Sequence, residues 1–243
     1  MPAKVLPDKF GELFEEAVPL VSSQRHQRDS PPVEGGRWPV SVILRPPADS
    51  GLSRLLDRLS SEAAALAGPG HWHTGRSGSA HLTVRALETF RQVVDPSEPV
   101  VQRYQAALQS AAAAAGPAVI QVVGLTLTPG TVMACAVPLD DQADLFLDRL
   151  AEALGPDGWF EHPHGRRDIW YFNLLHFTTT ITHPQRLIDW VTAHRFIPIG
   201  STTIRTAELV RFHHAPDATR SHMRPHVLAN ANLAQQATAS PAR

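Results

Sequence analysis

The feature that constrains the fold most is a repeated order of strands and helices in which each half carries one His-x-Thr tripeptide. His81-Leu82-Thr83 lies in the apolar run SAHLTVRAL, and His176-Phe177-Thr178 lies in WYFNLLHFTTTITHP. Both runs are rich in aliphatic, aromatic and threonine residues, which favour strands. Two matching halves predict an α+β fold with pseudo-two-fold symmetry. We expect two antiparallel sheets, flanked by helices, that form two lobes around a central cleft.

The expected elements follow from hydrophobic periodicity and from residues that end helices. In the first half, a strand near Trp38 is followed by helices over 49–68 and 95–116, with the SAHLTVRAL strand between them. The second half opens with a hairpin that turns at Thr128-Pro129-Gly130. Helices are expected over 140–155 and 183–194, and STTIRTAELVRF is expected to form the closing strand.

The chain divides into three segments by composition. Residues 1–37 are expected to form an N-terminal extension, with a short amphipathic helix and then a polar linker punctuated by proline and glycine. The folded domain is expected over 38–213. Residues 214–243 are polar and rich in alanine, asparagine and glutamine, which predicts a flexible C-terminal tail.

Charge and cysteine content narrow the classes of function. The net charge of −1 provides no global field to attract long nucleic acid or an anionic membrane, so an anionic ligand needs a local site. Cys135 is the single cysteine, which excludes an intramolecular disulfide and a cysteine-based zinc site. The sequence lacks a long apolar span and a signal-peptide centre, so we expect a cytoplasmic protein that does not contact the membrane. No obligate protein partner is inferred.

The two His-x-Thr tripeptides suit phosphodiester chemistry. Residues two apart in a strand point to the same face, so each histidine shares a face with its threonine. If both strands face one cleft, one imidazole can accept a proton from the attacking oxygen while the other donates one to the leaving oxygen. The hydroxyls of Thr83 and Thr178 can donate to the non-bridging phosphate oxygens. This chemistry requires no metal and no cofactor.

The alternative is that His81 and His176 are core histidines, with threonine present for its β propensity. Thirteen histidines would give roughly one or two His-x-Ser or His-x-Thr tripeptides by chance. Both tripeptides contain threonine, both lie in strand-like runs, and they occupy matching halves of the chain. The pair in this context therefore favours the catalytic interpretation.

Two His-x-Thr motifs in the halves of a bilobal α+β domain resemble the 2H phosphoesterase superfamily. It includes the bacterial 2'-5' RNA ligase-like proteins and the 2',3'-cyclic nucleotide phosphodiesterases. The resemblance covers roughly residues 38–213; HLTV fits the family pattern, whereas Thr179 in HFTT stands where an aliphatic residue is usual. It implies metal-independent cleavage of a 2',3'-cyclic phosphate or a 2'-5' linkage in a nucleotide or short RNA. It does not assign which histidine is the base.

Residues around the motifs are candidates for binding the rest of the substrate. Arg85 is expected on the face of Thr83, where its guanidinium would bind phosphate; an arginine in solvent or paired with a carboxylate is the alternative. Base stacking or a lid is assigned to Trp72, His73, Arg76, Arg166 and Trp170, with ordinary surface loops as the alternative. The histidine pairs elsewhere lack acidic partners at suitable spacing, so no metal site is expected.

Two further functions stay open. One is a nucleotide-binding or RNA-binding protein of the same fold without turnover. The other is the same chemistry on a phosphodiester in a small metabolite, which suits a near-neutral chain better than long RNA does.

Overall fold

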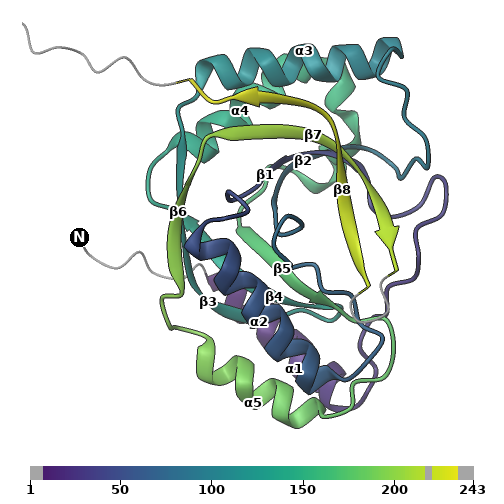
Figure 1. Ribbon diagram of the computed structural model, residues 1–243, viewed down its shortest axis with the longest axis vertical. Coiled ribbons are helices and arrows are strands. Elements are labelled where there is room, and N and C mark those ends of the chain that lie inside the picture. The colour runs from purple at the N-terminus through teal and green to yellow at the C-terminus, as the bar shows by residue number, and fades with distance from the viewer. Residues whose placement is uncertain (1–7, 217–220, 235–243) are drawn as a thin grey trace, which may run out of the picture.

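The computed structural model describes residues 8–216 and 221–234 (Figure 1). It contains two four-stranded sheets, with the strand orders β2-β1-β7-β8 and β5-β4-β3-β6. Every neighbouring pair of strands is antiparallel. The expected α+β fold, with two antiparallel sheets flanked by helices, is therefore confirmed.

The element bounds are as follows. The first sheet consists of β1 (Val40–Leu44), β2 (Leu82–Glu88), β7 (Thr206–Ala215) and β8 (His222–Asn232). The second sheet consists of β3 (Ala118–Leu127), β4 (Thr131–Pro138), β5 (Trp170–His176) and β6 (Gly200–Ile204). The helices are α1 (Asp8–Ser22), α2 (Gly51–Ala67), α3 (Pro99–Ala114), α4 (Gln142–Leu154) and α5 (Pro184–His194), and a 3-10 segment, η1, spans Gly155–His164.

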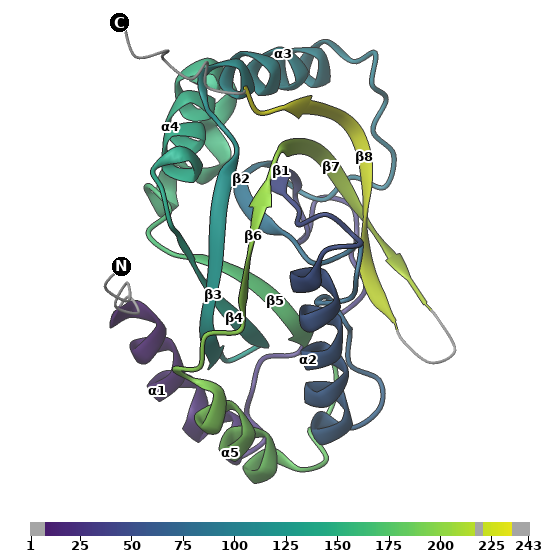
Figure 2. The same cartoon turned by 60° about the vertical axis from the view of Figure 1, so that its left-hand side comes forward.

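The helices cover the sheets at opposite ends of the molecule (Figure 2). At one end α3 packs against α4 and against β7 and β8; at the other, α1 and α5 pack against β3. β4 lies inside its sheet and is buried along its whole length, whereas the edge strand β2 alternates between buried and half-buried residues over its first five positions. This alternation is typical of a strand with one face in the core.

The N-terminal helix belongs to the domain core and is not an appendage. The expected helix is present as α1, and Phe14, Ala17 and Val21 on its buried face join the main hydrophobic core. The guanidinium of Arg195, which follows α5, lies 4.1 Å from the centre of the Phe14 ring. Residues 1–7 of the expected extension lie outside the described part of the chain.

The expectation of a flexible tail from residue 214 is wrong for residues 222–232, which form β8 and pair with β7. The polar composition misled because β8 is an edge strand with one exposed face, where polar residues and Pro225 are tolerated. The run STTIRTAELVRF also splits at Arg205, so that β6 and β7 lie in different sheets. Residues 217–220 and 235–243 of the expected tail are outside the described ranges. None of the helices described here has the length and apolar character needed to cross a bilayer.

Candidate functional site

The two motif strands occupy equivalent positions, because β2 is an edge strand of the first sheet and β5 is an edge strand of the second. The two strands also contact each other. His81 immediately precedes β2, and His176 is the last residue of β5. The fold thus brings together two histidines that lie far apart in the sequence.

His176 is held in one tautomer by a carboxylate. The ring is 2 % exposed, and its Nδ1 lies 2.6 Å from Oδ2 of Asp29. Because a carboxylate only accepts, Nδ1 carries a proton, and Nε2 is the ring nitrogen that is left for proton transfer. Nε2 is buried and has no hydrogen-bond partner among the described residues. Backbone bonds of 3.0 and 3.1 Å with Trp72 fix the strand end that carries the ring.

His81 is anchored through the same ring atom, although its partner is neutral. Its Nδ1 donates to the carbonyl oxygen of Ser79 at 2.8 Å, which leaves Nε2 as the acceptor. Burial lowers the pKa of His81 to about 4, the Ser79 carbonyl opposes this, and the positive charges of His176, Arg45 and Arg167 lower it further. A positive charge on His176 therefore disfavours protonation of His81.

Two aromatic side chains link the histidines. Trp38 lies beside His176 with ring centres 4.8 Å apart, and Phe212 lies beside His81 at 5.0 Å. Trp38 and Phe212 contact each other at 5.6 Å. Trp38 has a φ of 75°, a left-handed conformation that costs a residue with a side chain about 1–3 kcal/mol and is concentrated at functional sites. Its indole Nε1 is also buried without a partner in the described chain.

Asp29 is the functional candidate that sequence reasoning missed. It lies in the supposed linker, which instead runs along the segment that follows His176. The Asp29 amide donates to the Phe177 carbonyl at 2.7 Å, and His26 Nε2 donates to the Thr179 carbonyl at 2.9 Å. Arg37 also forms an ion pair with Asp29, whose side chain is 6 % exposed. No local pattern marks Asp29, because its contact with His176 depends on the fold of the whole chain.

The threonines of the two motifs lie in different settings. Thr83 is half-buried in β2 and alternates with the buried Leu82 and Val84, as expected. Thr178 follows the end of β5, and its hydroxyl donates to the Gly70 carbonyl at 2.6 Å. The hydroxyl of Thr178 therefore has to rotate before it can donate to a phosphate oxygen.

His71 supports the second motif through its backbone. Its Nδ1 accepts from the Thr178 amide at 3.2 Å, and its Nε2 donates to the Ala67 carbonyl at 3.2 Å. This hydrogen-bond pattern requires a neutral ring. Burial favours the same state, because it lowers the pKa of His71 to about 4.

The arginine candidates are placed differently from one another. Arg85 lies on the Thr83 side of β2, but its Nη2 donates to the Gly158 carbonyl in η1 at 2.8 Å. Arg166 forms an ion pair with Asp148 on α4 at 2.9 Å and is half-exposed. Arg167, its neighbour, pairs with Glu161 at 3.4 Å, and its positive charge is one of those that lower the pKa of His81. The structure thus favours Arg167 over Arg166 near the histidines.

The tryptophan candidates for base stacking are buried. Trp72 is 3 % exposed and packs in a cluster with Trp38 and Phe212, and Trp170 is 5 % exposed in the main core. Contrary to expectation, neither ring offers an open face to a base.

The amide of His73 donates to the Ser221 carbonyl at 2.9 Å, and Arg76 lines a pocket described below. Within the described ranges, no three His, Cys, Asp or Glu side chains group as metal ligands.

Comparison with known proteins finds similar solved structures but no similar sequence. No protein family model matches the sequence, and no curated protein sequence matches it. The protein TT0787 of Thermus thermophilus is similar over 81% of this chain and 98% of its own, with a TM-score of 0.57 and 14% identity. A protein described as a phosphoesterase gives a TM-score of 0.48 at 14% identity, covering 81% of this chain and 98% of its own. E. coli LigT complexed with 3'-AMP gives 0.49 at 13% identity, covering 85% of this chain and all of its own (100%).

At these identities the likeness to TT0787 concerns the fold alone. That fold agrees with the one implied by the two His-x-Thr motifs. The chain therefore shares the fold of TT0787.

Proposed function

We propose that this protein is a metal-independent phosphodiesterase that acts on a ribose phosphodiester, either a 2',3'-cyclic phosphate or a 2'-5' linkage, in a nucleotide or short RNA. The observation that carries the proposal is the matched anchoring of His81 and His176. Each ring is fixed through Nδ1, by Ser79 or Asp29, and each therefore presents Nε2 for proton transfer.

The unequal Nδ1 partners support different roles for the two histidines. His81, whose pKa is lowered to about 4, is neutral at pH 7 and serves as the general base. Burial also lowers the pKa of His176, but the hydrogen bond and the negative charge of Asp29 oppose this by stabilising the imidazolium. His176 is therefore the general acid once a phosphate anion is bound beside it.

For a 2',3'-cyclic phosphate, Nε2 of His81 takes a proton from a water molecule as the oxygen of that water bonds to phosphorus. Nε2 of His176 gives its proton to the ribose oxygen as the bond between that oxygen and phosphorus breaks. Thr83 and Thr178 donate to the non-bridging oxygens, where negative charge accumulates. The product is a ribose with one free hydroxyl and one phosphate monoester.

The test is an assay of the purified protein, treated with EDTA, on 2',3'-cyclic nucleotides and on a 2'-5' dinucleotide. We expect turnover of at least one substrate class at a rate that EDTA does not change. Binding of these ligands without any product would instead favour a nucleotide-binding protein. Turnover that EDTA abolishes and a divalent cation restores would contradict the proposal.

A further inference from the structure

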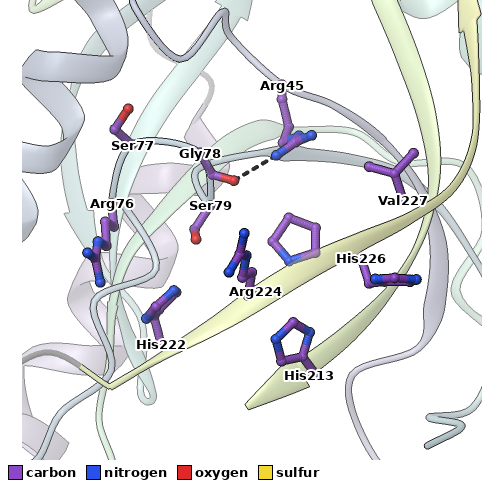
Figure 3. Close-up of a pocket in the computed structure, with 11 residues that line it drawn as sticks. Arg45, Arg76, Ser77, Gly78, Ser79, His213, His222, Arg224, His226 and Val227 are labelled. Carbon is purple, nitrogen blue, oxygen red and sulfur yellow. Dashed lines mark hydrogen bonds between the residues drawn. The ribbon is translucent and has the colours of Figure 1, made fainter. Parts of the chain in front are cut away.

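A pocket of about 890 Å³ is lined by basic side chains (Figure 3). Its walls are the Arg76–Ser79 loop and the hairpin formed by β7 and β8. The basic side chains that line it are Arg45, Arg76, His213, His222, Arg224 and His226.

The register of the hairpin gathers several of these side chains. His213 lies opposite Arg224, and Arg211 lies opposite His226, so these four residues share one face of the β7–β8 pair. Phe212, between Arg211 and His213, faces the other way and packs in the cluster with Trp38 and Trp72. The apolar face holds the hairpin in place, and the opposite face concentrates positive charge.

That positive charge is only partly neutralised. Arg45 is compensated, because its guanidinium forms two bonds of 2.6 Å with Glu208 and a third, of 2.7 Å, with the Gly78 carbonyl. Arg224 is exposed and forms no ion pair with any described residue. Burial lowers the pKa of His213, and the nearby Arg211, Arg224, His226 and His222 lower it further. Among the described residues, the side chains named here as lowering the pKa of His213 are therefore all basic.

The pocket also contains buried hydrogen-bonding capacity. Nδ1 of His213 is buried and has no partner among the residues that the structure describes. An unpaired polar atom in such a setting costs free energy unless a ligand or water satisfies it. A tetrahedral anion offers acceptors to both the imidazole and the guanidinium groups around it.

The pocket adjoins the proposed catalytic pair. Ser79 lines the pocket, and its carbonyl is the group that anchors Nδ1 of His81. The charge of Arg45, on the pocket wall, also acts on the pKa of His81. The Arg76–Ser79 loop that separates the two is tight, with the amides of Ser79 and Ala80 both donating to the Arg76 carbonyl at 2.8 and 2.9 Å.

We propose that this pocket binds a second phosphate group, distinct from the phosphate held between His81 and His176. Arg224 and His213 bind its oxygens. That this phosphate belongs to the substrate rests on the proposed function. That the pocket binds phosphate does not. The bound phosphate group belongs either to the same substrate molecule or to a free phosphate ion.

Binding is tested with inorganic phosphate, followed by NMR spectra of the histidine side chains. In the wild-type protein and in His176→Ala, we expect phosphate to shift the signals of His213, His222 and His226. In Arg224→Glu the phosphate dissociation constant measured from these signals should rise by about tenfold or more, because a charge-assisted hydrogen bond is replaced by repulsion. Arg186→Glu, which makes the same charge change at an exposed position on α5, should leave it unchanged.

The source of the phosphate is tested with a pair of substrates, a nucleoside 2',3'-cyclic phosphate with and without a 5'-phosphate. If the group belongs to the substrate, the 5'-phosphate lowers KM by about tenfold in the wild type, and Arg224→Glu removes this advantage. If NMR reports binding but KM does not change, the ligand is the free ion. Signals of the pocket histidines that do not respond to phosphate, or that respond equally in Arg224→Glu, overturn the proposal. If neither substrate turns over, the proposed function fails while the titration still decides the pocket.

Discussion

Replacing either His81 or His176 with alanine is expected to lower kcat/KM on the cyclic phosphate by about a thousandfold. Each ring contributes one of two proton transfers in the same step, and a positioned acid or base contributes about 10²–10⁴-fold to a rate. Because both transfers belong to one transition state, the double variant should lose much less than the product of the two single effects. Steady-state kinetics on the two single variants and the double variant measure this directly.

The control for these variants is His183→Ala. His183 is exposed and precedes α5, so its loss should leave the rate and the melting temperature unchanged. His176 is buried, so His176→Gln, which keeps a polar side chain beside Asp29, separates a chemical effect from a folding defect. A folded His81→Ala or His176→Ala protein that keeps the wild-type rate contradicts the assignment.

Changing Asp29 to asparagine is expected to lower kcat by about 10- to 100-fold, as for hydrogen-bond partners that orient metal-bound histidines. An amide can donate as well as accept, so it no longer fixes the proton on Nδ1 of His176. It also removes the negative charge that stabilises the imidazolium. Asp29 acts through His176 and is therefore a positioning residue.

The pH profile distinguishes this role from a purely structural one. Burial lowers the pKa of His176 and Asp29 raises it, so Asp29→Asn should lower that pKa further. A general acid must be protonated, which means that the alkaline limb of the kcat profile moves to lower pH. Asp189→Asn, at an exposed position on α5, is the matched control. A lower kcat with an unmoved alkaline limb would show that Asp29 only supports the fold.

Short-range patterns predicted much of the fold. Alternation along SAHLTVRAL correctly separated Leu82 and Val84, which are buried, from Thr83 and Arg85, which are half-buried. This works because side-chain direction in a strand has a period of two. The alternation did not predict that β5 ends at His176. The position of Thr178 beyond the end of the strand was therefore not predicted.

The parts of the site that were missed depend on contacts between distant segments. Asp29 reaches His176 only because the N-terminal segment lies along the strand end, and Arg224 meets His213 only through the β7–β8 register. Polar edge strands carry a weak hydrophobic pattern, so β8 had the composition of a tail. Trp72 and Trp170 were given a binding role because sequence does not distinguish a buried ring from an exposed one.

The central claim is that His81 and His176 act on one phosphate, and a crystal structure with a nucleoside 2'- or 3'-phosphate tests it most directly. We predict that oxygens of that phosphate, or its ester oxygen, lie within roughly 2.6–3.2 Å of Nε2 of both histidines, with both Nδ1 contacts retained. A nucleotide whose phosphate contacts only one of the two rings, or neither, would contradict the account.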